Sequence, residues 1–152
     1  MPHRYMKVEK INQGTVIDHI LPAKAFDVLR VLKLSPDRSM SILVNSHSKK
    51  GGKKDILKFE NLELSEEQAT LVAMVSPKAT INIIADGEVV KKFKAEPPKV
   101  VRGMLTCSNP NCISNQNEPI VSEFKLSSDE DHRYVCTYCE RDIVDLAKYV
   151  RL

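Results

Sequence analysis

The stretch that decides how the C-terminal third folds is CSNPNCISNQNEPIVSEFKLSSDEDHRYVCTYC, residues 107–139. It holds all four cysteines of the 152-residue chain, arranged as Cys107-x4-Cys112, 23 intervening residues and Cys136-x2-Cys139. Two close cysteine pairs joined by a long loop are typical of a tetrahedral zinc site, because each tight turn presents two thiolates from one side of the ion. Four thiolate ligands leave no position for water, so the pattern predicts one structural Zn²⁺ rather than a catalytic one.

The same cysteines allow three other interpretations. They fit two disulfides, a thiol redox pair formed by Cys136 and Cys139, or iron in a rubredoxin-like site. Metal is favoured over disulfides because MPHRYMKVEK, residues 1–10, lacks the apolar run of a signal peptide, and cytosolic thiols stay reduced. The sequence also contains no apolar run long enough to cross a membrane. We therefore expect a cytoplasmic protein whose small C-terminal unit needs a metal to fold.

Charge divides the chain at nearly the same point as the cysteines. Residues 1–100 hold 17 Lys/Arg and 12 Asp/Glu, a net of +5, and residues 101–152 hold 6 and 8, a net of −2. Between the two lies AEPPK, residues 95–99, a polar break with two prolines. We expect a domain over residues 1–97 and a second over 101–152, and we expect the positive domain to attract an anion.

In the first domain, short strands alternate with two helices. A capping box, Ser65-x-x-Gln68, marks the start of the second helix, and Asp86-Gly87 is a hairpin turn. From residue 15 the order is strand, helix, strand, strand, helix, strand, which predicts an α+β, ferredoxin-like sandwich: an antiparallel sheet with two helices on one face and a free face for a ligand or partner. Strands are expected over residues 5–11, 15–20, 39–45, 55–61, 80–85 and 88–94, and helices over about 22–34 and 65–75. The expected buried stripe of the first helix contains Ala25, Phe26, Val28, Leu29 and Leu32.

The second domain shows mostly short strands. They are expected over residues 101–106, 119–126 and 133–135, whereas residues 142–150 fit a short helix about as well as an irregular strand. These features predict a small all-β, rubredoxin-like zinc domain.

Two groups in the first domain could carry chemistry. Asp18 and His19 are neighbours on an expected strand, so their side chains point to opposite faces and, taken alone, suggest two surface residues. Lys54 and Lys58 lie an even number of positions apart and would share a face, where they could hold a phosphate group, although such a lysine-rich segment is usually only a solvated loop. No phosphate-binding loop, dinucleotide fingerprint, zinc-protease helix or nucleophile elbow is present, which lowers the odds of an enzyme.

A nucleic-acid-binding zinc-ribbon protein is the main rival interpretation. Against it, the cysteine-bearing unit has a net negative charge, and the chain has only four Phe, four Tyr and no Trp for stacking on bases. The lysines of this chain are concentrated on the other domain. We therefore expect neither a nucleic acid nor a membrane as partner.

Several segments together resemble the regulatory chain of aspartate carbamoyltransferase. They are VEKINQGTVIDHI at residues 8–20, KKDILKFEN at 53–61, ATINII at 79–84, CSNPNCISN at 107–115 and CTYCE at 136–140, in the same order and over nearly the whole chain. The resemblance implies a subunit without an active site. Its N-terminal domain would bind the effectors CTP and ATP and pair with a second regulatory chain, and its zinc domain would dock on the catalytic chain. CTP and ATP would thereby tune the first committed step of pyrimidine biosynthesis.

The resemblance also implies a nucleotide site. Asp18 would take ribose hydroxyls, the lysines would take the triphosphate, and backbone groups would contact the base. This sequence departs from the family pattern at Gly87, where familiar members carry a tyrosine, and at Lys10, where they carry a small residue; both departures concern base contacts and the choice of effector. The implied site residues are Val8, Glu9, Lys10, Ile11, Val16, Asp18, His19, Lys54, Lys58, Asn82, Ile84, Val89 and Lys92.

The implied docking surface lies beside the metal. It falls on Asn109 and Asn111 in the first cysteine turn and on Glu140 and Arg141 after the second. The asparagines are also residues that turns of this kind prefer, so they are expected both to shape the turn and to face the partner.

Overall fold

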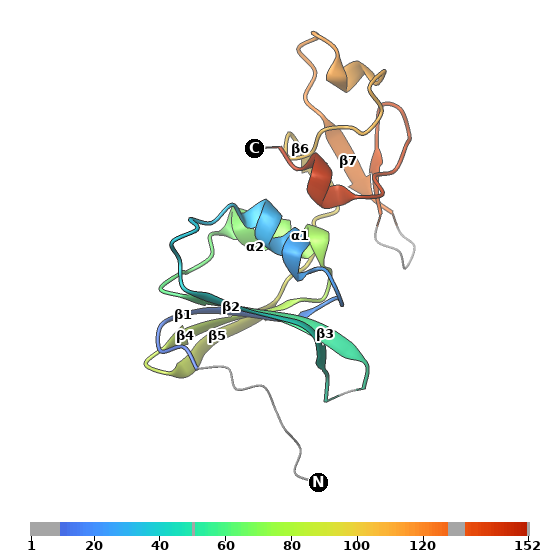
Figure 1. Ribbon diagram of the computed structural model, residues 1–152. Helices are drawn as coiled ribbons and strands as arrows, with labels where there is room; N and C mark the ends of the chain where they lie inside the picture. The colour runs from blue at the N-terminus through green and yellow to red at the C-terminus, as the bar shows by residue number, and fades with distance from the viewer. Residues whose placement is uncertain (1–9, 50, 128–132, 152) are drawn as a thin grey trace.

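Figure 1 shows the computed structural model of the chain, which describes residues 10–49, 51–127 and 133–151. A five-stranded sheet carries both α-helices on one face, and a three-stranded sheet forms part of a smaller unit. The two helices lie between the large sheet and the smaller unit (Figure 1). The opposite face of the large sheet, hereafter the outer face, therefore points away from the smaller unit.

The large sheet has the strand order β2-β3-β1-β4-β5, and all neighbouring strands are antiparallel. This confirms the predicted ferredoxin-like order, to which β5 adds an edge strand. The strand predicted over residues 5–11 lies mostly outside the described residues, and Lys10 and Ile11, which are described, lie in no strand. The elements are β1 (Gly14–Ile20), α1 (Ala25–Leu32), β2 (Met40–His47), β3 (Lys53–Glu60), α2 (Glu66–Val75), β4 (Thr80–Ala85) and β5 (Glu88–Lys94).

Alternation along β3 separates the two faces of the sheet. Asp55, Leu57 and Phe59 are fully buried on the helix side. Lys54 and Lys58, on the alternate positions, are only partly covered and lie on the outer face, as their spacing predicts. The core under the helices is mainly aliphatic, because the chain has few aromatic residues. Its fully buried members include Ile17, Ile20, Val28, Leu57, Phe59, Val72 and Ile81.

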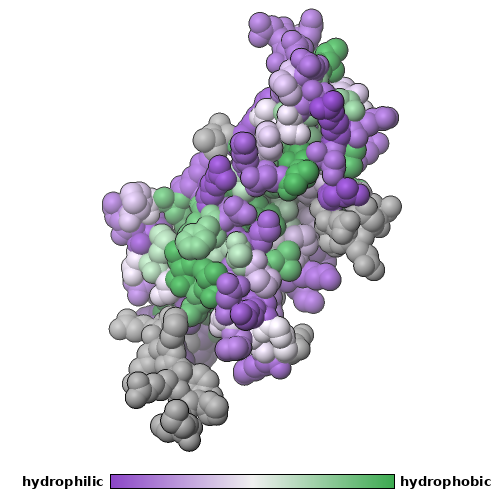
Figure 2. Space-filling view, turned by 45° about the vertical axis from the view of Figure 1, so that its right-hand side comes forward, coloured by the Kyte–Doolittle hydropathy of each residue, from purple (hydrophilic) through white to green (hydrophobic). Residues whose placement is uncertain are grey.

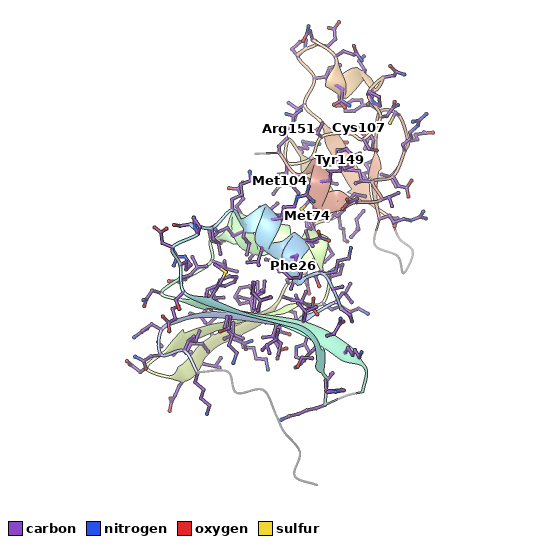
Figure 3. The ribbon with its side chains drawn as sticks, in the orientation of Figure 1. Phe26, Met74, Met104, Cys107, Tyr149 and Arg151 are labelled. Carbon is purple, nitrogen blue, oxygen red and sulfur yellow. The ribbon has the colours of Figure 1, made fainter. Side chains whose placement is uncertain are left out.

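Helix α1 is shorter than predicted, and one residue of its predicted stripe is wrong. Phe26 is 62% exposed, whereas the buried positions are Ala25, Val28, Val31 and Leu32. In an α-helix Phe26 lies about 100° around the axis from Ala25, which turns its ring away from the sheet. Figure 3 shows Phe26 on α1. Leu29 is partly buried against the core.

Local sequence signals are confirmed elsewhere. The Ser65 hydroxyl accepts from the Gln68 amide at 3.1 Å, and Gln68 Oε1 accepts from the Ser65 amide at 3.0 Å, which completes the capping box of α2. Asp86 and Gly87 have φ values of 52° and 76°. A two-residue hairpin with both φ values positive is the turn that this dipeptide favours, because it matches the twist of the flanking strands.

The smaller unit is built from short strands, as predicted, although the first two are shorter than the predicted ranges 101–106 and 119–126. Antiparallel β6 (Val100–Arg102), β7 (Glu123–Leu126) and β8 (Tyr134–Cys136) form the sheet in that order. A 3₁₀ turn, Ile113–Asn115, follows the first cysteine pair, and a second, η2 (Leu146–Tyr149), settles the ambiguous C-terminal segment as mainly a short turn. Across the described ranges, no helix has the length and apolar character needed to span a lipid bilayer.

Candidate functional site

The outer face of the large sheet carries a cross-strand row with a lysine at each end. Lys58 on β3 pairs with Val16 on β1, which pairs with Asn82 on β4. Asn82 in turn pairs with Lys92 on β5. Three inter-strand spacings separate the lysine positions, about 14 Å between backbones. Within the described part of the chain neither lysine forms an ion pair, so both ammonium groups are available to an anion lying across the sheet.

Rows on either side extend this face. Gly14 pairs with Ile84, and Ile84 pairs with Val89, which is 54% exposed. On the other side, Asp18 pairs with Thr80. The structure thus gathers much of the implied nucleotide site on or beside the outer face. The gathered residues are Val16, Asp18, His19, Lys54, Lys58, Asn82, Ile84, Val89 and Lys92.

Asp18 and His19 lie where a β-bulge interrupts the pairing of β1 with β3 before Ile20. His19 has a φ of 57°, so the regular alternation of faces assumed for this strand does not hold. The Asp18 carboxylate forms an ion pair with Lys54 Nζ at 2.9 Å and accepts a hydrogen bond from the His19 amide at 2.7 Å. The His19 ring instead lies 3.1 Å from Thr80 Oγ1. The two side chains therefore form no carboxylate–histidine dyad.

These contacts set the charge of Asp18. Burial acts to raise its pKa, but hydrogen bonds from Lys54 and from the His19 amide outweigh burial and hold the pKa below its ordinary value of 3.8. Asp18 is therefore an anion at neutral pH, and its oxygen lone pairs can accept further hydrogen bonds from hydroxyl groups.

The N-terminal part of the implied site is described only from Lys10. Val8 and Glu9 lie outside the described residues, Lys10 is exposed and Ile11 is buried. The Gly87 amide donates to the Asn12 carbonyl at 3.0 Å, so the segment entering β1 passes beside the β4–β5 hairpin. Ile11, the residue before Asn12, therefore lies in the segment that passes this hairpin.

The four cysteines form a compact cluster. Their sulfur atoms all lie within 4.8 Å of one another, with Cys107 and Cys139 3.6 Å apart and Cys112 and Cys136 3.7 Å apart. Sulfurs about 2.3 Å from a tetrahedral ion would be separated by about 3.8 Å, so the cluster fits one metal ion. None of the four forms a disulfide. The donor set is that of a soft or borderline ion such as zinc.

Burial of the thiols shows in their pKa values. Burial raises the pKa of Cys107 to about 12 and also raises that of Cys136. At Cys139 burial acts in the same direction, but hydrogen bonds from the Arg141 amide and Cys107 outweigh it and lower the pKa to about 7. Like charges this close disfavour one another, so all four thiols can ionise together only around a cation.

Backbone and side-chain hydrogen bonds hold the two cysteine turns. Asn109 Oδ1 accepts from the Asn111 amide at 3.1 Å, which is the turn role expected of an asparagine. The Asn115 side chain donates to the carbonyls of Cys107 and Asn109 at 2.9 and 2.7 Å. In the second turn, Glu140 has a φ of 62° and donates its amide to the Cys136 carbonyl. Asn115 was missed in the sequence, because its partners become neighbours only when the turn closes.

The surface around the metal cluster combines the implied docking residues with apolar side chains. Asn111, Glu140 and Arg141 are exposed, and Asn109 is half-buried. Beside them in the sequence, Ile113 is 48% exposed and Tyr138 45% exposed. The Tyr138 hydroxyl donates to the carbonyl of Val121, itself an exposed residue. Sequence reasoning missed Ile113, Val121 and Tyr138, for which the only signal was apolar residues close to the cysteine turns.

Comparisons with known proteins identify the family. Residues 6–96 match the family model for the allosteric domain of the aspartate carbamoyltransferase regulatory chain, and residues 99–146 match the model for the metal-binding domain of that chain. Relatives named aspartate carbamoyltransferase regulatory chain include those of Methanococcus maripaludis, 46% identical over 92% of this chain and 94% of the relative, and Archaeoglobus fulgidus, 45% identical over 97% and 99%. That of Ignicoccus hospitalis is 46% identical over 97% of this chain and 98% of the relative.

A ferredoxin-like allosteric domain followed by a four-cysteine metal-binding domain defines the class: a regulatory subunit, the non-catalytic part of an enzyme complex. The chain belongs to the family of aspartate carbamoyltransferase regulatory chains.

Proposed function

We propose that residues 1–97 form a domain that binds CTP or ATP on the outer face, and that residues 101–152 form a zinc domain that docks on the catalytic chain of aspartate carbamoyltransferase. Bound nucleotide would then tune the first committed step of pyrimidine biosynthesis in the cytoplasm, where the cysteines stay reduced. The observation that carries this proposal is the row from Lys58 to Lys92 with the Asp18 carboxylate beside it.

The outer face offers a separate group for each part of a nucleoside triphosphate. Lys58 and Lys92 lie at the two ends of the cross-strand row, where each ammonium group can neutralise phosphate groups as a point charge. Asp18 can accept the ribose hydroxyls, since its carboxylate is ionised and half-buried. Val89, which is exposed and pairs with the buried Ile84, supplies apolar surface against which a base can pack.

A single zinc ion per chain would serve as the structural centre of the second domain. Cys107, Cys112, Cys136 and Cys139 would hold it, and the ion would supply folding energy rather than chemistry. The surface that would contact the catalytic chain consists of the half-buried Asn109 and the exposed Asn111, Ile113, Val121, Tyr138, Glu140 and Arg141. An aromatic and two aliphatic side chains together with amides and charges have the composition of a protein interface.

The second regulatory chain would pair at the β2 edge of the large sheet. The two edge strands differ sharply: β5 carries Glu88 and three lysines, which protect an edge against pairing, whereas β2 (MSILVNSH) contains no lysine or acid. Ile42 and Val44 of β2 are each 38% exposed, and the exposed ring of Phe26 lies on α1. Apolar side chains gather on the surface of this domain in Figure 2. An uncharged edge strand with apolar neighbours suits a second copy of the same edge.

Regulation follows from unequal binding of the nucleotide to two states of the complex, since a ligand shifts an equilibrium only by its difference in affinity. The direct test of the first step is isothermal titration calorimetry of the full-length, zinc-loaded chain with CTP and with ATP. Saturable binding of one nucleotide per chain supports the proposal, and the absence of binding by either nucleotide contradicts it.

A further inference from the structure

Asp55 is a fully buried carboxyl group on the strand that carries the outer-face lysines. It lies between Lys54 and Ile56 on β3, but its side chain points toward the helices and has no exposed surface. Its two oxygens accept backbone hydrogen bonds from two other elements. Oδ2 accepts from the Ala25 amide at 2.9 Å, and Oδ1 accepts from the Asn45 amide at 2.8 Å. One side chain thereby connects β3, α1 and β2.

The first of these bonds supplies a cap that α1 lacks locally. Lys24 occupies the N-cap position and makes no capping hydrogen bond with its side chain. Asp55 Oδ2 binds the first helical amide instead, from a position 30 residues further along the chain. A negatively charged carboxylate at the N-terminus of a helix is also stabilised by the helix dipole. The start of α1 is therefore fixed by a side chain of β3 rather than by a residue next to the helix in sequence.

The second bond fixes the shape of the β2 edge. Asn45 has a φ of 57° and lies in the register shift that separates Leu43 from Ser46 in the pairing of β2 with β3. A bulge frees a backbone amide from the strand ladder, and Asp55 accepts that amide. The bulge lies next to Val44, on the edge proposed to meet the second regulatory chain.

Helix α1 in turn reaches the metal-binding unit. Both helices pack near η2, and Lys24 and Asp27 line a cavity of about 310 Å³ whose opposite wall includes Ile143 and Leu146. Figure 3 shows Met74, on α2, and Met104, in the smaller unit, at the junction of the two units. A displacement of α1 would therefore change its contacts with the metal-binding unit.

We propose that Asp55 is the positioning residue that couples the outer face to both the β2 edge and the metal-binding unit. The outer face and the smaller unit lie on opposite sides of the sheet, so a nucleotide signal must cross the sheet and the helix layer (Figure 1). Asp55 joins β3 to the first residue of α1 and follows Lys54, which is bound to Asp18. A shift of β3 on nucleotide binding moves the Ala25 and Asn45 amides together. The inference rests on the proposed nucleotide site.

Amide hydrogen exchange on the ¹⁵N-labelled, full-length, zinc-loaded chain tests this coupling. The Gln68 amide is the internal reference, because its helix N-terminus is capped locally by Ser65 and not by Asp55. Saturating CTP or ATP should slow exchange at Ala25 and Asn45 by about fivefold or more relative to Gln68. Binding seen by calorimetry with no selective slowing at Ala25 and Asn45 overturns the coupling alone. No binding of either nucleotide overturns the nucleotide site and the coupling together.

A matched pair of variants separates coupling from simple capping. Asp55→Asn keeps one acceptor oxygen but replaces the second by an amide donor, and should bind nucleotide while losing the selective slowing at Ala25 and Asn45. Asp27→Asn removes a carboxylate from the first turn of the same helix, without a bridge to β3, and should retain the slowing. If nucleotide still slows both amides in Asp55→Asn as in the wild type, the role of Asp55 is only structural and the proposal fails. Should Asp55→Asn not fold, the wild-type comparison decides.

Discussion

Replacing Lys58 with methionine removes one charge from the proposed triphosphate site and keeps most of the side-chain stem. An ammonium about 4 Å from a phosphate oxygen gains about 1 kcal/mol at the dielectric constant of water and about 4 kcal/mol at an effective value of 20. Lys58 is partly covered, which places it between these limits. A loss of about 1.4 to 2.8 kcal/mol corresponds to a 10- to 100-fold rise in Kd for CTP and ATP.

The matched control is Lys53→Met. Lys53 lies on the same strand, but at an alternate position, so its side chain leaves the sheet on the other face. The net charge of both variants is identical. Calorimetry at about 0.15 M salt should find less than about a twofold change in Kd for Lys53→Met, because exposed charges more than about 8 Å apart are largely screened at that salt concentration. Raising the salt concentration should narrow the gap between wild type and Lys58→Met. Equal affinity for wild type and Lys58→Met, or equal weakening by both variants, would refute the assignment of the outer face.

Three further predictions concern the ion pair, the metal and the sheet edge. Lys54→Met should raise the pKa of Asp18, measured by ¹³C titration of its carboxyl carbon, because the lysine hydrogen bond no longer offsets burial. Since the pKa of Asp18 is depressed in the folded state, the ion pair stabilises the fold above pH 3.8, and this stabilisation is lost as pH falls through the folded pKa. An unchanged pKa of Asp18 in Lys54→Met would contradict the pairing. Chelation of the metal should unfold residues 101–152 and abolish binding to the catalytic chain, while amides of β1 and β4 stay protected in exchange experiments; retention of binding by the metal-free chain would rule out a structural metal. Val44→Lys should convert a dimer to a monomer in analytical ultracentrifugation, because a charge on the β2 edge opposes pairing, whereas Val90→Lys on the β5 edge should leave the dimer intact.

Features that depend on residues close in sequence could be predicted. The capping box of Ser65 and Gln68 and the hairpin at Asp86 and Gly87 are complete within a few residues, so their chemistry is visible in the chain itself. The alternation of β3 placed Lys54 and Lys58 on one face for the same reason. The spacing of the cysteines likewise indicated a metal site, since the ligands must come in close pairs.

Features that depend on tertiary contacts could not. The cap of α1 comes from Asp55, so the sequence around Lys24 contains no capping signal, and the helix start was predicted too early. Phe26 was assigned to the core because helical periodicity alone does not say which edge of an apolar stripe faces the sheet. The bulge at His19 changed the relation between two adjacent side chains. The cross-sheet row from Lys58 to Lys92 needed the register of four strands, which no local pattern contains.

The most direct test of the account is the activity of a reconstituted complex. The zinc-loaded chain would be mixed with an aspartate carbamoyltransferase catalytic chain, the complex isolated by size exclusion, and carbamoyl transfer to aspartate measured at increasing CTP and ATP. We expect the two chains to co-elute and nucleotide to change the aspartate response. The Lys58→Met complex should assemble equally well but need about 10- to 100-fold more nucleotide for the same change. A complex that assembles with the wild-type chain yet shows the same aspartate response at saturating CTP and ATP as without them would contradict the account.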